Sequence, residues 1–250
     1  MDLNLNGRVA LVTGGANGVG REIALALAAE GAAIALNYRS SAEDARTVAA
    51  EIEAAGGRVQ TYAADVADHE AVKGMVAQIV SDFGSLGIVV NNAGLALRNR
   101  FVDTTPDEWK RQIDTCLYGA IHTAHAAAAH LERSGHGRIV SLIGDSSRVG
   151  ESGLSIVAAA RAGVIGLMKS LAREMGRSGV TANTVSLGLV ETAHDKAWVD
   201  ANREKLVKFY PTRRLGQPAD IAPTVALLAS DHGAWITGQV VSISGGFSMV

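Results

Sequence analysis

The amino-acid sequence predicts an α/β protein with one doubly wound, parallel sheet of seven strands and helices on both faces. Three observations lead to this prediction. Short runs rich in Val, Ile and Leu alternate with longer segments in which apolar residues recur at helical spacing. The runs are continuously apolar, as expected for strands that helices cover on both sides. A glycine-rich turn follows the first run, where such sheets bind nucleotides.

The alternation assigns the elements in order. Strands are predicted at residues 9–13, 33–37, 59–63, 86–91, 137–143, 181–187 and 239–244. Helices are predicted at 18–30, 42–55, 68–83, 106–133, 153–176 and 218–230. The segment 188–212 follows a strand end and breaks the pattern, so it is expected to cover the carboxyl edge of the sheet as a substrate lid. No linker or repeat divides residues 1–250, which are predicted to be a single domain.

Composition narrows the possible partners. The 250 residues carry 23 basic and 25 acidic side chains, a net charge of -2, which gives no reason to expect nucleic acid or an anionic membrane surface. The single cysteine excludes an intrachain disulfide and favours a reducing, cytoplasmic setting. No basic stretch followed by an apolar run opens the chain, so no signal peptide is expected, and no segment is expected to span a membrane.

The turn between the first strand and the first helix predicts a Rossmann-type dinucleotide site. Glycines there permit a tight turn and bring backbone N–H groups close to a pyrophosphate, and the helix N-terminus adds a favourable dipole. A purely structural turn is the alternative. The residues of this turn that are predicted to bind the cofactor are Gly14, Gly15, Ala16, Asn17, Gly18, Val19 and Gly20.

The end of the second strand selects between cofactors. An acid at this position binds both ribose hydroxyls of NAD(H) and repels a 2′-phosphate. This chain has Tyr38 there, followed by Arg39 and Ser40, which could bind a 2′-phosphate through charge-assisted hydrogen bonds. The sequence therefore favours NADP(H) over NAD(H). The alternative is that Arg39 is only a solvated surface charge.

Several motifs together resemble the classical short-chain dehydrogenase/reductases. They are Thr-Gly-x-x-x-Gly-x-Gly at 13–20, Asp-Val at 65–66, Asn-Asn-Ala-Gly at 91–94, Gly-Leu-Val-Glu-Thr at 188–192 and the segment 236–246. The resemblance implies further cofactor contacts from Asp65, Val66, Asn92, Ala93, Gly94, Arg161, Val190 and Thr192. It also implies a homotetramer, with a dimer as the second choice.

The same resemblance locates four catalytic positions, and all four differ from the family pattern. The family uses a Tyr as proton donor, a Lys four residues later, a Ser thirteen residues before the Tyr, and an Asn in the long preceding helix. This chain has Val157, Arg161, Gly144 and Cys116 there. Val157 has no proton to donate, and a guanidinium does not deprotonate usefully. The alignment therefore excludes the usual Tyr general-acid mechanism.

Other side chains near these positions are weaker candidates. Arg161 could hold a ribose or an anionic substrate, and Cys116 could be a nucleophile but is more simply a small buried residue. A solvated charge or polar group is the simpler interpretation for six others: Asp145, Ser146, Arg148 and Glu151 after the fifth strand, and His194 and Asp195 in the lid. His122, His125 and His130 lack partners at ligand spacing, so no metal site is predicted.

Three functions remain open. The first is an atypical NADP(H)-dependent oxidoreductase that reduces a carbonyl, imine or enone and takes its proton from water or substrate. The second is a non-catalytic nucleotide-binding or regulatory subunit. The third is non-redox chemistry with Arg161 as an anion clamp. Residues 144–153 resemble those of alicyclic hydroxyacyl-CoA dehydrogenases, and the chain also resembles 3-oxoacyl-ACP reductases, which suggests an acyl thioester or carboxylate as the small-molecule ligand.

Overall fold

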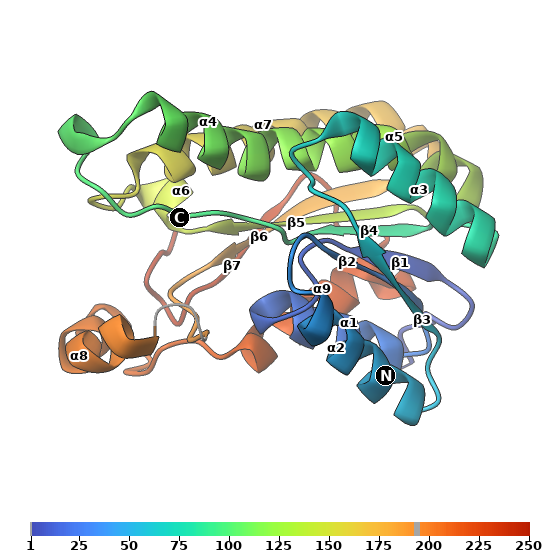
Figure 1. Ribbon diagram of the computed structural model, residues 1–250, viewed down its shortest axis with the longest axis horizontal. Helices are drawn as coiled ribbons and strands as arrows, with labels where there is room; N and C mark the ends of the chain where they lie inside the picture. Colours follow the sequence, from blue (N-terminus) through green and yellow to red (C-terminus); the bar gives the residue numbers. More distant parts are fainter. Residues whose placement is uncertain (1, 193–195) are drawn as a thin grey trace.

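A computed structural model of the chain describes residues 2–192 and 196–250, and it confirms the predicted fold class. Seven parallel strands form one sheet in the order β3-β2-β1-β4-β5-β6-β7 (Figure 1). The order reverses between β1 and β4, which creates the crevice where doubly wound sheets bind ligands. The strands are β1 Val9–Val12, β2 Ala33–Tyr38, β3 Val59–Ala63, β4 Ile88–Asn91, β5 Arg138–Gly144, β6 Thr181–Leu187 and β7 Val240–Ile243.

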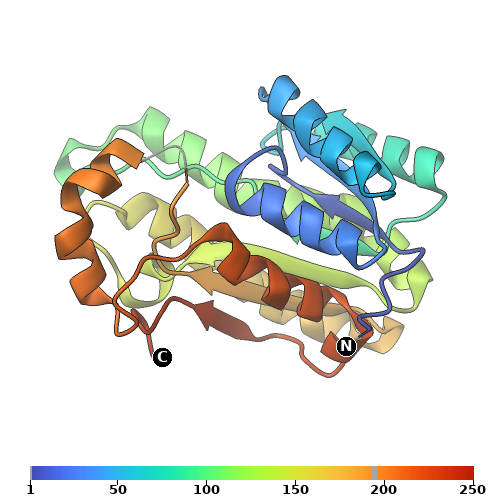
Figure 2. The same ribbon diagram turned by 90° about the horizontal axis from the view of Figure 1, so that it is seen from below.

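Helices cover both faces of the sheet (Figures 1 and 2). One layer contains α1 (Gly18–Ala29), α2 (Ala42–Ala54) and α9 (Pro218–Ala229). The opposite layer contains α3 (His69–Phe83), α4 (Pro106–Ile113), α5 (Gly119–Ser134) and α7 (Ser155–Met175). Each layer has its own apolar core against the sheet.

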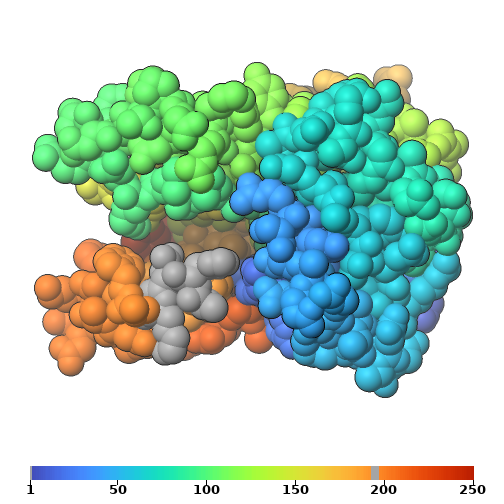
Figure 3. Space-filling view, viewed as in Figure 1, coloured from blue at the N-terminus to red at the C-terminus, as the bar shows by residue number. Residues whose placement is uncertain are grey.

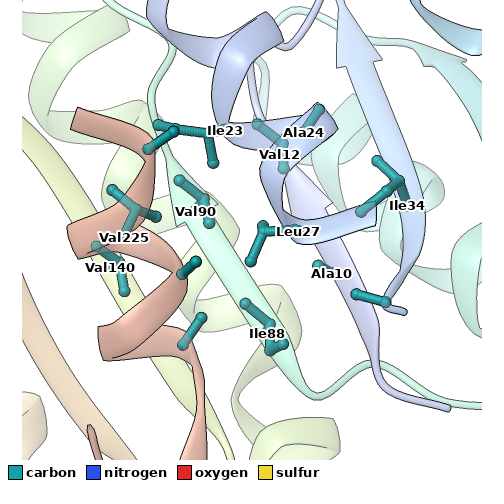
Figure 4. Close-up of a cluster of buried hydrophobic side chains, with 14 of the residues drawn as sticks. Ala10, Val12, Ile23, Ala24, Leu27, Ile34, Ile88, Val90, Val140 and Val225 are labelled. Atoms are coloured by element: carbon teal, nitrogen blue, oxygen red, sulfur yellow. The ribbon is translucent and has the colours of Figure 1, made fainter. Parts of the chain in front are cut away.

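The core under α1 and α9 fixes the helix that follows the glycine-rich turn. Ile23 and Leu27 of α1 and Val225 of α9 pack over Ile88 and Val90 of β4 (Figure 4). All five side chains are fully buried, and burying a side chain of this size contributes about 1.5–3 kcal/mol. This packing holds the N-terminus of α1 at the carboxyl edge of β1 and β4.

A network of charged hydrogen bonds fixes the start of α9. The Asp220 carboxylate accepts hydrogen bonds from the Gln217 backbone N–H at 2.7 Å and from both Nη atoms of Arg214 at 2.6 and 2.7 Å. The Arg214 guanidinium and the Gln217 N–H lower the pKa of Asp220 to about 2.

Asp220→Asn is therefore expected to destabilise the protein in a pH-dependent way. The folded-state pKa of Asp220 lies below its unfolded value of about 3.9, so its contribution is present above that value and is lost as the pH falls towards 2. We expect a loss of about 1 kcal/mol at pH 7, typical of a helix-capping group, and a smaller loss at pH 3. Urea unfolding of both proteins at the two pH values measures this, and an equal loss at both would contradict it.

The structure differs from the sequence prediction in three helical segments. The helix expected at 106–133 is interrupted by a π-helical turn at Asp114–Tyr118, between α4 and α5. The predicted lid 188–212 contains an unpredicted helix, α8 (Lys196–Leu206), and a short helix, α6 (Ser146–Val149), follows β5.

Residues 155–178 are long and apolar enough to cross a membrane by length and composition, contrary to the expectation from sequence. In the structure, this segment is mainly α7, which lies along the sheet. Its buried residues Val164, Met168 and Met175 belong to the core of that layer. Only 28% of the apolar window is buried in the structure, so packing on the sheet accounts for part of its apolar character.

Candidate functional site

The glycine-rich turn of residues 13–20 joins β1 to α1 at the carboxyl edge of the sheet. Gly14 and Gly18 have positive φ angles of 61° and 54°, which favour glycine. The Gly15 N–H donates to the Asn37 carbonyl at 2.9 Å, so the turn is tied to β2. Asn17 is the N-cap of α1, and its side chain makes no capping hydrogen bond. The first N–H groups of α1 are thus available to an anion such as a pyrophosphate.

Close packing leaves no room for side chains on the inner side of this turn. A Cβ on Gly20 would lie 2.3 Å from the Gly14 carbonyl oxygen and 2.4 Å from Asn92 Nδ2. A Cβ on Gly15 would lie 3.0 Å from Leu36 Cγ. The backbone can therefore form this cradle only with glycine at 20, as expected of a glycine-rich turn that binds a dinucleotide.

Asn92, directly after β4, joins this strand to the turn. Its Nδ2 donates to the carbonyl oxygens of Thr13 and Gly14 at 3.0 and 3.1 Å. In return, Thr13 Oγ1 accepts hydrogen bonds from the backbone N–H groups of Asn92 and Ala93 at 2.9 and 3.0 Å. The predicted contacts Asn92, Ala93 and Gly94 thus lie beside the glycine-rich turn, at the point where the strand order reverses.

Arg39 lies in the open at the end of β2. Its side chain is 61% exposed, and its Nη1 is 3.7 Å from Asp65 Oδ2. Ser40 is also exposed. The guanidinium therefore has free hydrogen-bond donors at the position where the second strand faces the ribose of a dinucleotide. Val66, the neighbour of Asp65, is instead buried against α5, where a Cβ on Gly119 would lie 2.8 Å from it.

The segment after β6 passes close to the glycine-rich turn. Val190 pairs with Gly216, and Thr192 Cγ2 lies 3.3 Å from the position that a Cβ on Gly18 would have. Tyr210 holds the segment in place, because its hydroxyl accepts a hydrogen bond from the Leu189 N–H at 2.9 Å, and burial raises the pKa of this hydroxyl. The lid candidates His194 and Asp195 lie outside the described residues.

Cys116 occupies the middle of the π-helical turn. Its Sγ accepts a hydrogen bond from the Leu95 N–H at 3.4 Å and donates one to the Leu95 carbonyl at 3.3 Å. The residue is buried, and Val157 and Ala160 pack beside it. These contacts give Cys116 a structural role, because they hold the loop after β4 against the π-helical turn between α4 and α5.

The guanidinium of Arg161 lies between two glycines from separate segments of the chain, Gly144 and Gly94. Its Nη1 is 3.1 Å from the position of a Cβ on Gly144, and its Nη2 is 3.0 Å from that of a Cβ on Gly94. Val157, one helical turn earlier, is fully buried. The four predicted catalytic positions thus come together. Among these four, only Arg161 presents side-chain hydrogen-bond donors that have no partner in residues 2–192 and 196–250. Arg161 and Cys116 line a small pocket with Asn91 and Ala93.

The loop after β5 is less exposed than expected. Asp145 is buried, and its carboxylate accepts hydrogen bonds from the hydroxyls of Ser186 and Ser242, so the expectation of a solvated charge is wrong there. Arg148 donates to the carbonyl of Val250. Glu151 forms an ion pair with Arg98 at 2.5 Å.

Arg98 is a residue that sequence reasoning missed. It joins the loop after β4 to the loop after β5, through Glu151 and the Ser152 carbonyl, and it lies 5.6 Å from the ring of Trp198 in α8. Figure 3 shows a hollow between the part of the molecule that contains α4 and the part that contains α8. No local pattern marks Arg98, because its partners come from distant segments.

Each of the three histidines of α5 contacts a neighbouring residue. His122 Nδ1 lies 2.9 Å from the Val66 carbonyl, and its ring contacts that of His69. His125 is near His69 as well, and His130 contacts Arg133. Within residues 2–192 and 196–250, no group of three or more His, Cys, Asp or Glu is arranged to hold a metal ion.

Comparison with known proteins covers nearly the whole chain. A family model described as enoyl-(acyl carrier protein) reductase matches residues 14–248. The chain is 42% identical over 240 residues to a 3-oxoacyl-[acyl-carrier-protein] reductase FabG of Staphylococcus aureus, covering 96% of this chain and 98% of the relative. It is 37% identical over 247 residues to (2S)-[(R)-hydroxy(phenyl)methyl]succinyl-CoA dehydrogenase subunit BbsD of Thauera aromatica, with 99% of both chains covered.

Solved structures agree with these matches. A short chain dehydrogenase from Burkholderia cenocepacia J2315 in complex with NADP is 38% identical, with a TM-score of 0.90 over 97% of this chain and 98% of the other. A blue fluorescent protein from a metagenomic library in complex with NADPH is 35% identical, with a TM-score of 0.93 over 98% of this chain and 100% of the other.

Proposed function

Because this chain belongs to the classical short-chain dehydrogenase/reductase family of oxidoreductases, we propose that it is an NADP(H)-dependent reductase of an atypical kind. It reduces a carbonyl, or an imine or enone, without the Tyr, Lys, Ser and Asn that relatives use. The observation that carries this proposal is the glycine-rich cradle before α1, which leaves no room for a side chain at Gly20. A bound nicotinamide supplies the hydride.

The preference for NADP(H) rests on Arg39. Its guanidinium is exposed at the end of β2, with Ser40 beside it and Asp65 at 3.7 Å. A guanidinium can donate two parallel hydrogen bonds to a phosphate. Two similar solved structures are described as complexes with NADP and NADPH, which supports the same choice.

Arg39→Ala is expected to weaken NADPH binding about 10- to 100-fold and to leave NADH binding nearly unchanged. The physical reason is the loss of a charge-assisted hydrogen bond to the 2′-phosphate, which contributes about 1.5–3 kcal/mol. Fluorescence titration with both nucleotides measures the effect. Arg46→Ala is the matched control, since Arg46 is exposed on α2 and pairs with Glu43. Equal weakening for NADPH and NADH would contradict the assignment of Arg39.

We further propose an acyl thioester as the substrate class. Relatives named for reactions on 3-oxoacyl carrier protein and on a succinyl-CoA derivative support it. We place this ligand in the hollow between the α4 and α8 regions (Figure 3). Consumption of NADPH with acetoacetyl-CoA, a small 3-oxoacyl thioester, tests this proposal.

A second candidate is a nucleotide-binding subunit without catalysis of its own. The buried Val157 favours it, because no proton donor occupies this position, and one relative is named as the subunit of a dehydrogenase. Tight NADPH binding without turnover of acetoacetyl-CoA, together with a second chain that copurifies from the native cell, would favour this candidate over the reductase.

For assembly, we propose a homotetramer in the cytoplasm. The exposed apolar residues Trp235, Tyr118 and Met249 offer surface for contacts between copies. Light scattering during size-exclusion chromatography distinguishes a tetramer from a dimer.

A further inference from the structure

A cavity of about 160 Å³ lies between four parts of the chain, away from the glycine-rich turn. These parts are residues 188–190 after β6, residues 210–216, the first turn of α9 and the end of β7. Of the described residues predicted to contact the cofactor, only Val190 lines this cavity, and none of the four catalytic positions does. The cavity is therefore distinct from the small pocket beside Arg161.

Apolar side chains make up much of the cavity wall. Leu215 and Ile221 are buried members of the packed interior, and Leu189 and Ile243 are partly buried against it. An apolar cavity of about 150 Å³ in another protein binds benzene. The present cavity thus has the size and the lining for a ligand of about six heavy atoms.

The charged side chains in the wall are paired with each other. Arg214 donates from its two Nη atoms to the Asp220 carboxylate at 2.6 and 2.7 Å, and its Nη1 also donates to the Leu215 carbonyl at 3.1 Å. A charged ligand would lose its hydration and, among the described lining residues, would meet no unpaired opposite charge. The wall therefore favours a neutral ligand.

Tyr210 adds one polar group to this apolar surface. Its side chain is buried, and its hydroxyl accepts a hydrogen bond from the Leu189 N–H at 2.9 Å. A tyrosine hydroxyl also has a hydrogen to donate, and no acceptor takes it within residues 2–192 and 196–250. Because Tyr210 and Leu189 both line the cavity, an acceptor atom on a bound ligand is placed to receive this hydrogen bond, as buried donors require.

We propose that this cavity is a second ligand site, which takes a small neutral molecule with an apolar ring and one oxygen atom that accepts a hydrogen bond from Tyr210. The apolar part of the ligand contacts Leu215, Ile221 and Ile243. This inference goes beyond the proposed reductase function, because it uses no catalytic position and needs no turnover.

Two ring compounds of equal size test the site. Tetrahydropyran has one ether oxygen that accepts hydrogen bonds, cyclohexane has none, and neither contains a carbonyl group that a reductase could use. We would titrate each into the full chain by calorimetry, for the wild type and for Tyr210→Phe, with and without NADP⁺. Tyr62→Phe is the matched control, since Tyr62 is also buried and its hydroxyl donates to Asp82 at 2.8 Å, near β3 at the other edge of the sheet.

We expect the wild type to bind both compounds with dissociation constants of about 0.1–10 mM, as suits ligands of this size. Tyr210→Phe should weaken tetrahydropyran binding about two- to tenfold, the range for one neutral hydrogen bond, and should leave cyclohexane binding nearly unchanged. Tyr62→Phe should match the wild type for both compounds, and NADP⁺ should displace neither.

A second measurement locates the ligand without any substitution. Nuclear Overhauser contacts between tetrahydropyran and the methyl groups of Leu215 and Ile243 are expected in the wild-type protein. They keep the proposal testable if Tyr210→Phe does not fold.

Four results would overturn the proposal. They are failure of the wild type to bind tetrahydropyran, wild-type affinity in a folded Tyr210→Phe, contacts to other methyl groups only, and displacement by NADP⁺, which would make the cavity part of the nucleotide site. Failure of the proposed function is a separate result, because the titrations without NADP⁺ require neither nucleotide binding nor turnover.

Discussion

Gly20→Ala is expected to lower the affinity for NADPH at least about 100-fold. The added Cβ would lie 2.3 Å from the Gly14 carbonyl oxygen and 2.4 Å from Asn92 Nδ2, and neither backbone nor a doubly hydrogen-bonded amide can yield easily. The turn must open, and the bonds from Asn92 to Thr13 and Gly14 must break. Loss of two charged hydrogen bonds to phosphate corresponds to the expected change.

Gly74→Ala is the matched control for this substitution. Gly74 lies within α3, as Gly20 lies within α1, but a Cβ there meets no atom within 4 Å. Alanine should stabilise that helix by about 1 kcal/mol and leave nucleotide binding unchanged. Calorimetric titration with NADPH compares the two variants. Wild-type affinity in Gly20→Ala would show that the cradle does not hold the nucleotide.

Restoration of a proton donor is expected to produce the second large effect. The triple variant Gly144→Ser, Val157→Tyr and Arg161→Lys brings back the family residues at three positions. We expect it to reduce acetoacetyl-CoA with NADPH about 10²- to 10⁴-fold faster than the same triple variant with Val157→Phe, the range for a positioned general acid. The two variants differ by a single hydroxyl, so the comparison isolates proton donation.

The aromatic ring at position 157 is expected to lower the free energy of unfolding of both triple variants, the one with Tyr and the one with Phe. Val157 is fully buried beside Cys116 and Ala160, and inserting atoms into a packed region typically costs about 1–3 kcal/mol. Urea unfolding should show this loss equally for the Tyr and Phe variants. Equal turnover by two variants that are both folded would mean that residue 157 does not face the substrate, and that the alignment of the catalytic positions is wrong.

The parts of the fold that the sequence predicts well are those with strong local patterns. The predicted strand 33–37 agrees with β2 to within one residue, because the apolar run at 33–36 is typical of a strand covered on both faces. Helix α8 was not predicted, because most of its residues are polar and exposed and few apolar residues mark it as a helix. The π-helical turn at Asp114–Tyr118 was also missed, since residues on either side of it have ordinary helical spacing.

In the candidate site, too, the features that could be predicted are those formed by residues adjacent in the sequence. The glycine-rich turn could be predicted because its residues are adjacent in the chain. The proximity of Ser146 and Arg161 to Gly144 could not be predicted, because the three residues come together only after α6 and α7 have packed. Asp145 could not be recognised as buried, because its partners Ser186 and Ser242 come from the ends of two other strands.

The π-helical turn also has an evolutionary consequence. Such a turn contains one residue more than a regular helix needs, and one residue corresponds to about 100° of rotation around the axis. An insertion or deletion within Asp114–Tyr118 would therefore rotate α4 relative to α5, and would withdraw Cys116 from Leu95. We therefore expect a change in the number of residues in this turn to disturb the packing of α4 and α5 more than a substitution at position 116 does.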